Sequence, residues 1–197
     1  MLLDVCLGSR SAWKIFFVLA EAPGKAVSRK EIRAFTLMGN KMVDKYVVLL
    51  NQFEIIVVNK IGKRKYYKLN LNSPFVPKLL DLIKLEKEKL ESINVNIINV
   101  LREFVYEATN VDKDNLIKIF LFGSYAKRTY THSSDVDVAL IMKERNPAEE
   151  LLITEIVDRL EKRFGKEIQT HYLTENYFLS NTKLVNEIKK DGIVVFP

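Results

Sequence analysis

The sequence predicts an α+β protein in which two domains are joined by a long helical segment. Three observations carry this prediction. In the first third, helical patterns are followed by two short β-rich runs. Between residues 73 and 110, apolar residues recur at helical spacing over about four heptads. Within residues 116–140, a strand, a turn, a short helix and a second strand follow one another. We therefore predict domains at residues 1–72 and 111–197, with a linking helix at 73–110.

Helical patterns occur three times before residue 53. The first covers residues 11–20. The second begins at Ser28, which forms a capping box with Glu31, and it is expected to turn Ile32 and Phe35 toward the core. The third begins near residues 39–40. Such an order leaves three amphipathic helices that can pack on one another.

The sequence predicts a β-hairpin after these helices. Residues 55–60 and 65–70 are the two strands, and residues 61–64 form the turn between them. Three helices followed by a basic hairpin resemble a winged helix-turn-helix domain, from roughly Leu7 to Asn72. The resemblance implies that the third helix enters the DNA major groove and that the hairpin tip contacts the DNA backbone or minor groove.

Charge supports a polyanionic partner for this domain. Residues 1–72 contain thirteen Lys and Arg against five Asp and Glu, a net charge of +8, whereas residues 73–110 and 111–197 each carry −1. The candidates for base or phosphate contact are Asn40, Lys41, Asp44 and Lys45, and those for phosphate contact are Lys60, Lys63, Arg64 and Lys65. The alternative is a protein-binding winged domain with a solvated basic face.

The segment from Ser73 to residue 110 carries a heptad-like stripe. Ser73 is a suitable N-cap before Pro74. The stripe consists of Val76, Ile83, Leu90, Ile97 and Phe104. It predicts either one long helix or two helices broken near Ser92-Ile93-Asn94. The first half is expected either to pack in a core or to pair with a second copy of the chain as a homodimer.

Residues 116–140 contain the chemical centre of the sequence. Residues 116–121 are apolar and β-branched, and Gly123 allows the chain to leave this strand abruptly. On the next strand Asp135 and Asp137 point to the same side, because side chains alternate between faces. Two such carboxylates suit Mg²⁺, and the N–H groups after Gly123 with the Ser124 hydroxyl suit a phosphate. Enzymes of phosphoryl or nucleotidyl transfer use such a combination of metal-binding carboxylates and a phosphate-binding turn.

Gly-Ser, ten intervening residues and Asp-x-Asp resemble the signature of the minimal nucleotidyltransferases of the DNA polymerase beta superfamily. The resemblance extends from about Asn115 to the C-terminus. It implies Mg²⁺ on Asp135 and Asp137 and a nucleoside triphosphate held near Gly123 and Ser124. It also implies transfer of a nucleoside monophosphate to an acceptor hydroxyl. Lys127 and Arg128 are the candidates for neutralising phosphate charge.

Two positions depart from the family pattern. Arg128 stands where members usually carry glycine, so either the loop conformation differs or the guanidinium adds a phosphate contact. Gln169 stands at the expected third carboxylate, and an amide cannot act as a general base. Glu167 is the alternative catalytic carboxylate if the register is shifted. His171, on the same face, is either a metal or base residue or a half-buried ring.

The remaining features of the sequence concern the cellular location of the protein and its partners. The sequence has no apolar run of membrane-spanning length and no signal-peptide pattern, and its one cysteine is Cys6, so we expect a cytoplasmic protein without a membrane partner. The acceptor is left open between a protein hydroxyl, an RNA end and a small molecule. The competing hypothesis is a transcriptional regulator whose transferase fold is a degenerate nucleotide sensor. The family resemblance alone also raises a nucleotidylating antitoxin paired with a toxin.

Overall fold

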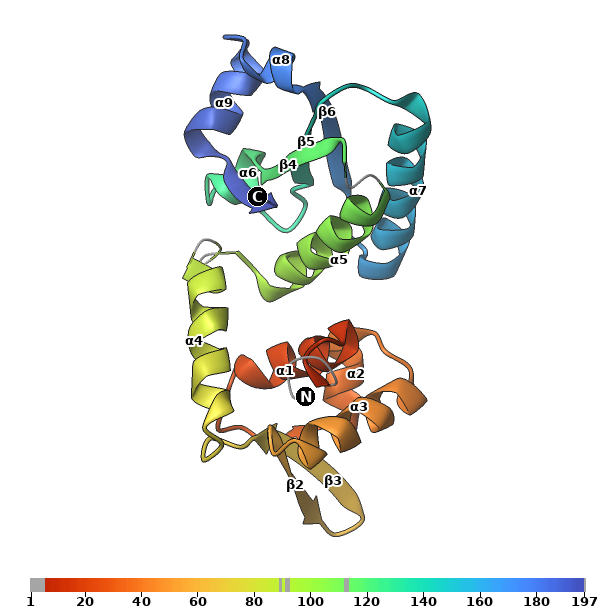
Figure 1. Cartoon of the computed structure of the whole chain (residues 1–197), viewed down its shortest axis with the longest axis vertical. Coiled ribbons are helices and arrows are strands. Elements are labelled where there is room, and N and C mark those ends of the chain that lie inside the picture. The colour runs from red at the N-terminus through yellow and green to blue at the C-terminus, as the bar shows by residue number, and fades with distance from the viewer. Residues whose placement is uncertain (1–5, 89, 91–92, 112–113, 197) are drawn as a thin grey trace. The chain divides into compact units, whose positions relative to one another are not determined.

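The computed structural model describes residues 6–88, 90, 93–111 and 114–196 of the 197-residue chain. The chain divides into two compact units, Met1–Glu88 and Lys89–Pro197. Figure 1 shows the elements of each unit. Of the helices in the described residues, none is both long enough and apolar enough to cross a membrane.

The first unit contains the helices and the hairpin that the sequence predicts. Its elements in chain order are α1 (Arg10–Ala20), β1 (Val27–Ser28), α2 (Arg29–Thr36), α3 (Asn40–Gln52), β2 (Ile56–Ile61), β3 (Arg64–Leu69) and α4 (Phe75–Glu88). The strands form an antiparallel sheet in the order β1-β3-β2. The β2–β3 hairpin extends beyond the helices, as Figure 1 shows.

Helix α2 begins with the capping box that its sequence predicts. The Ser28 hydroxyl accepts a hydrogen bond from the Glu31 N–H at 3.3 Å, and the Glu31 carboxylate accepts one from the Ser28 N–H at 2.8 Å. Ile32 is fully buried. Phe35, expected to face the core, is instead 49% exposed. It lies three residues after Ile32, on the edge of a short helix whose core-facing side is narrow.

Residues 73–110 form two helices, so the prediction of a single long linking helix is wrong and its two-helix alternative holds. Helix α4 ends at Glu88 and α5 runs from Val95 to Val111. The predicted break at Ser92-Ile93-Asn94 falls between them, although Ser92 itself lies outside the described residues. The heptad-like stripe is also divided. Val76 and Ile83 pack in the core of the first unit, whereas Ile97 and Phe104 pack in that of the second.

The second unit is built on a mixed sheet. Its remaining elements are β4 (Leu116–Leu121), α6 (Gly123–Ala126), β5 (Val136–Met142), α7 (Pro147–Phe164), β6 (Ile168–Thr174), α8 (Glu175–Phe178), α9 (Lys183–Asp191) and β7 (Ile193–Phe196). The strand order is β6-β5-β4-β7. Strands β5 and β6 are parallel, and the other two pairs are antiparallel.

Helices cover both faces of this sheet. Residues of α5 and α7 pack against Ile119, Leu121, Val138 and Leu140 on one face. Phe178 of α8 and Ile188 of α9 pack on the other face, in a cluster with Phe120, Ala139, Ile141 and Leu173. Figure 1 shows the two helix pairs on opposite sides of the strands. Because strand side chains alternate, residues with the parity of Ala139 face α8 and α9.

Candidate active site

The turn after β4 brings the backbone at Gly123 against the Asp137 carboxylate. The Phe122 N–H donates a hydrogen bond to the Asp137 carbonyl at 3.0 Å, which joins the end of β4 to β5. Gly123 has a φ of 67°. A Cβ atom built there would overlap the Asp137 carboxylate and would lie 2.8 Å from its Cγ. Glycine is therefore required at this position both for the backbone conformation and for the space.

Asp135 and Asp137 lie close enough for the charge of Asp135 to act on Asp137. Asp137 is the second residue of β5, and Asp135 lies one residue before the strand begins. Val136 and Val138, of the opposite parity, are fully buried in the core beneath α5 and α7. Asp137 therefore lies on the side of the sheet that α8 and α9 cover.

Burial dominates the electrostatics of Asp137. It raises the pKa of this carboxyl above its ordinary value of 3.8. The neighbouring charge of His171 opposes the increase, whereas the negative charges of Asp135 and Glu187 add to it. Asp137 is thus a partly desolvated carboxylate with like charges around it, and a bound cation would relieve that repulsion.

Strand β6 places Gln169 beside Asp137. The parallel register pairs Asp137 with Gln169 and Ala139 with His171. The His171 ring packs edge-on against Phe122, with 5.2 Å between ring centroids, which agrees with a half-buried aromatic role. Glu167 is exposed and precedes the strand, and its carbonyl accepts a hydrogen bond from the Val136 N–H at 2.9 Å. The amide therefore belongs to the residue of β6 that is aligned with Asp137.

Lys127, predicted to hold phosphate, is engaged by an acidic side chain that the sequence analysis missed. Its ammonium donates to the Glu187 carboxylate on α9 at 2.5 Å. This hydrogen bond is the main cause that raises the pKa of Lys127. Glu187 lies in an ordinary amphipathic helix, so no local signal marked it. Its role depends on α9 packing against α6.

Arg128 has a backbone conformation that favours glycine. Its φ is 61°, in the left-handed region that glycine adopts without strain. The Arg128 side chain is exposed next to Lys127. Ser124 is half-buried, and its carbonyl accepts a hydrogen bond from the Thr129 N–H at 3.0 Å. These bonds fold the residues after α6 into a compact turn.

The predicted DNA-contacting residues fall into two groups in the first unit. Lys63, Arg64 and Lys65 line a groove of about 800 Å³ together with Arg29 and Lys30, two basic residues that the sequence analysis did not single out. Asp44 lines the same groove and forms an ion pair with Arg29 at 3.0 Å.

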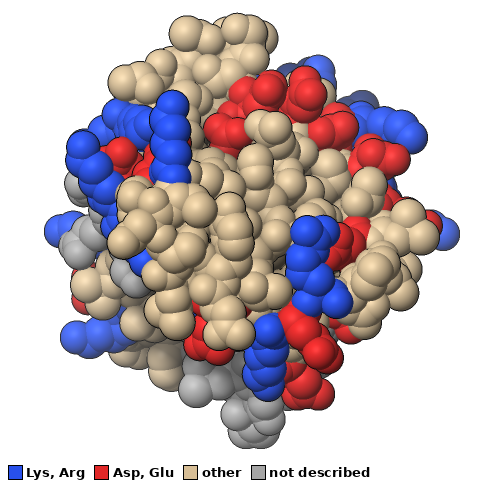
Figure 2. All heavy atoms as spheres, turned by 90° about the horizontal axis from the view of Figure 1, so that it is seen from above, with Lys and Arg blue, Asp and Glu red and all other residues tan. Residues whose placement is uncertain are grey.

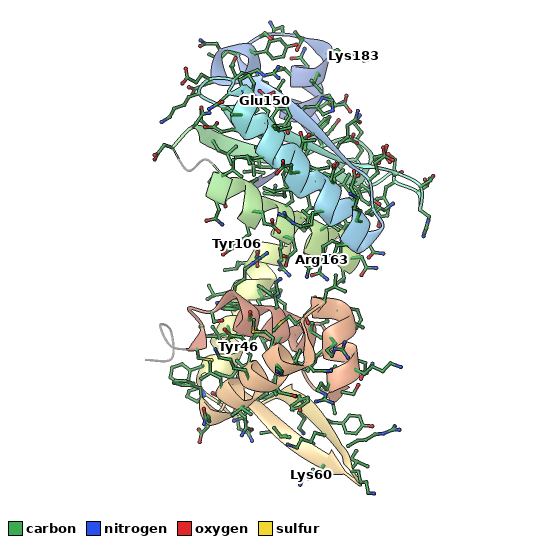
Figure 3. The ribbon with its side chains drawn as sticks, turned by 90° about the vertical axis from the view of Figure 1, so that its right-hand side faces the viewer. Tyr46, Lys60, Tyr106, Glu150, Arg163 and Lys183 are labelled. Atoms are coloured by element: carbon green, nitrogen blue, oxygen red, sulfur yellow. The ribbon has the colours of Figure 1, made fainter. Side chains whose placement is uncertain are left out.

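The other predicted residues lie outside that groove. Lys60 lines a second hollow of about 570 Å³ between α3 and β2, and Lys65 lines both hollows. Figure 3 shows Lys60 on the projecting hairpin. Asn40, Lys41 and Lys45 are exposed on α3 and line neither hollow. Figure 2, by contrast, shows a face on which acidic and basic side chains are interspersed.

Replacement of Gly123 by alanine tests the close approach to Asp137. We expect Gly123→Ala to lower the free energy of unfolding by about 2–4 kcal/mol, because left-handed strain and steric overlap act together. Gly165→Ala is the matched control. Gly165 has a φ of 63° and nothing within 4 Å of a built Cβ, so it should cost only about 1–2 kcal/mol. Denaturant unfolding measures both. Equal costs would contradict the overlap.

The raised pKa of Asp137 predicts a pH-dependent gain in stability for Asp137→Asn in metal-free buffer. Below pH 3.8 the acid is protonated in both the folded and the unfolded states and has no effect. As the pH rises through that value and through the higher folded pKa, ionisation destabilises the folded wild type. The stability of Asp137→Asn relative to wild type should therefore increase from about pH 3 to pH 7. The exposed Asp158→Asn should show no such trend, and a pH-independent difference for Asp137→Asn would contradict burial.

Comparisons with known proteins agree with this geometry in the second unit. Residues 107–197 match the family model described as "Polymerase beta, Nucleotidyltransferase". Two proteins of Methanocaldococcus jannaschii, both named "Putative protein adenylyltransferase", are 42% identical over 50 residues and 47% identical over 45 residues. The alignments cover 25% and 23% of this chain, and the chain spans 50% and 31% of the relatives' length.

A solved structure from Mycobacterium bovis, a homodimeric winged helix-turn-helix DNA-binding domain, is 17% identical with a TM-score of 0.36, covering 44% of this chain and 76% of that one. That score is too low to indicate a shared fold. The match to the family model stands independently of it and includes the turn at Gly123 and both aspartates. Over residues 107–197 this chain is therefore similar to the nucleotidyltransferases of the polymerase beta family model.

Proposed function

We propose that this domain transfers a nucleoside monophosphate from a nucleoside triphosphate to an acceptor hydroxyl. The observation that carries the proposal is the Asp137 carboxylate lying directly against the glycine turn. In the proposed site, Asp135 and Asp137 hold Mg²⁺, while Gly123 and Ser124 hold the β- and γ-phosphates. This arrangement would place the metal carboxylates next to the phosphate oxygens that share the ion.

The residues present fit Mg²⁺. Across the described ranges, no group of three or more His, Cys, Asp or Glu side chains could hold a metal ion without other ligands. Mg²⁺ is commonly bound by one or two carboxylates together with substrate phosphates and water, so two aspartates suffice when the nucleotide is present. The ion would supply charge neutralisation on the reacting phosphate. Burial and like charges disfavour the ionised form of Asp137, so a bound cation would stabilise this carboxylate most.

The two basic side chains of the turn, Lys127 and Arg128, would differ in how readily they contact the triphosphate. Lys127 already donates one hydrogen bond to Glu187, so its charge on a phosphate would be shared with that carboxylate. In the described part of the chain, Arg128 has no ion-pair partner, so its charge would not be shared in this way. Glu167 is the proposed general base although the register aligns Gln169 with Asp137, since an amide cannot accept the acceptor's proton. Nucleotidyl transfer depends mainly on positioning and electrostatics, so an exposed base is adequate.

The relatives' names favour a protein acceptor. Both matched relatives are named as protein adenylyltransferases, which would make ATP the donor and a protein hydroxyl the acceptor. If this chain is a nucleotidylating antitoxin, the acceptor protein would be its partner toxin.

We further propose that the first unit is a winged helix-turn-helix domain that binds DNA. The order of three helices and a hairpin supports it, as does the net charge of +8 over residues 1–72. Exposed leucines on α4, Leu82 and Leu85, support a homodimer through that helix, because they lie outside the core that Val76 and Ile83 enter. Two copies could then contact two half-sites.

A second function is favoured by Gln169 lying opposite Asp137. In this alternative the protein is a DNA-binding transcriptional regulator, and its nucleotidyltransferase fold binds a nucleotide without transferring it. The intact glycine turn and paired aspartates serve binding in both cases. Transfer of label separates the two functions.

Incubation with labelled nucleoside triphosphates, Mg²⁺ and lysate of the source cells tests the transferase. We expect label on an acceptor, and Asp137→Asn should reduce the rate at least about 100-fold because it removes a metal carboxylate. The exposed Asp158→Asn on α7 makes the same charge change away from the turn and should keep the wild-type rate. Nucleotide binding without transfer by the wild type would support the regulator instead.

Replacement of Lys63 and Arg64 together by methionine tests DNA binding. The double variant should bind duplex DNA more weakly at every sequence, and the slope of log K against log salt should fall by about 2, because two phosphate contacts are lost. Lys143→Met with Lys162→Met, both exposed in the second unit, removes the same charge outside the groove and should leave that slope unchanged. A salt-insensitive wild-type affinity would refute phosphate contact.

A further inference from the structure

Lys166 ties together segments that are distant in sequence. It lies in the connection between α7 and β6. Its ammonium donates hydrogen bonds to the His132 carbonyl at 2.6 Å and to the Ser134 carbonyl at 2.9 Å. Both acceptors belong to the loop that precedes the paired aspartates. Two charge-assisted bonds from one side chain to a loop more than thirty residues away are a specific tether.

The same ammonium also contacts the helix that follows the glycine turn. It lies 5.8 Å from the ring centroid of Tyr125, a residue of α6 that is buried in the core. Tyr125 in turn stacks on Tyr130 with 4.5 Å between ring centroids. A cation near an aromatic ring is attracted to it. Lys166 thus connects the loop, α6 and the start of β6.

The loop itself is a small hydrogen-bonded turn. The Ser134 hydroxyl accepts from the Thr131 N–H at 2.8 Å, and the Ser134 N–H donates to the Thr131 carbonyl at 3.2 Å. These bonds shape the turn but do not attach it to the sheet. Lys166 supplies that attachment through the carbonyls of His132 and Ser134.

Asp135 lies between two tethers that both come from the residues before β6. On one side, the Ser134 carbonyl accepts from Lys166. On the other, the Val136 N–H donates to the Glu167 carbonyl at 2.9 Å. Asp135 precedes β5 and is outside its ladder, so the backbone position of this carboxylate depends on residues 166 and 167.

We propose that Lys166 is a positioning residue that holds Asp135 beside Asp137 for the metal and the nucleotide. This inference rests on the proposed function, and it assigns Lys166 no contact with substrate. A phosphate-binding role is the obvious alternative for a lysine near such a site. It is disfavoured because two of the three ammonium donors already serve carbonyls and the ammonium packs near Tyr125.

Two measurements on the full chain test this role. Lys166→Met keeps the apolar stem and removes the donors, Lys166→Arg keeps a cation that can donate, and Lys162→Met on the exposed side of α7 is the control. Amide hydrogen exchange follows residues 131–136 without ligand. Calorimetry measures ATP binding with Mg²⁺ and, separately, with a chelator.

For Lys166→Met we expect faster exchange in residues 131–136, with α7 and the sheet unchanged, and about tenfold weaker binding of Mg²⁺–ATP. Lys166→Arg should recover part of both, and Lys162→Met should match the wild type. An equal loss of ATP affinity with and without Mg²⁺ would overturn the proposal in favour of phosphate contact. Faster exchange throughout the unit, or unchanged exchange and binding, would also overturn it.

Failure of the proposed function gives a different result. If the wild type binds no Mg²⁺–ATP, the transferase proposal fails. This outcome is seen with the wild type alone and does not depend on any Lys166 variant. Hydrogen exchange then still decides the tether: loop-specific acceleration in Lys166→Met supports it, and unchanged exchange refutes it.

Discussion

The close approach of the Asp137 carboxylate to the Gly123 backbone is the constraint on which the candidate site depends. The hydrogen bond from Phe122 to Asp137 joins the ends of β4 and β5, and this leaves no room for a side chain at the turn. Residue 123 therefore cannot acquire a side chain without moving an acid of the site. The approach also places the first turn of α6 next to the carboxylate, so the positions proposed for phosphate and for metal are set by one backbone geometry.

Negative charge is concentrated around that geometry. Asp135, Asp137 and Glu187 act on one another, and Lys127 is held by Glu187. A triphosphate would meet unfavourable charge in such a site without a cation. The same arrangement becomes favourable when a divalent ion is shared between the carboxylates and the phosphates. Electrostatics alone would thus make nucleotide binding depend on metal, even if the Gln169 position leaves catalysis weak.

Short-range rules predicted much of this structure from the sequence. Alternation along β5 placed Asp137 on the face opposite the buried Val136 and Val138, because a strand's period is fixed by its backbone, and the register aligned Gln169 rather than Glu167 with it. The capping box at Ser28 also follows from adjacent residues. By contrast, Glu187 and Lys166 reach the site across long sequence separations, and only packing decides such contacts. The stripe from Val76 to Phe104 suggested one long helix, but its residues pack in two separate cores. A continuous apolar repeat in the sequence does not show where one core ends and the next begins.

Strand β7 pairs with β4, the strand that leads into the glycine turn. Leu121 is aligned with Ile193 and Phe120 with Val194, so the sheet that carries both aspartates is completed by residues near position 196. During synthesis, the first unit can fold from a continuous stretch of chain while the second is still incomplete. The proposed nucleotide site would therefore be complete only after these late residues have left the ribosome. The proposed DNA-binding surface on residues 1–88 would form earlier on the nascent chain.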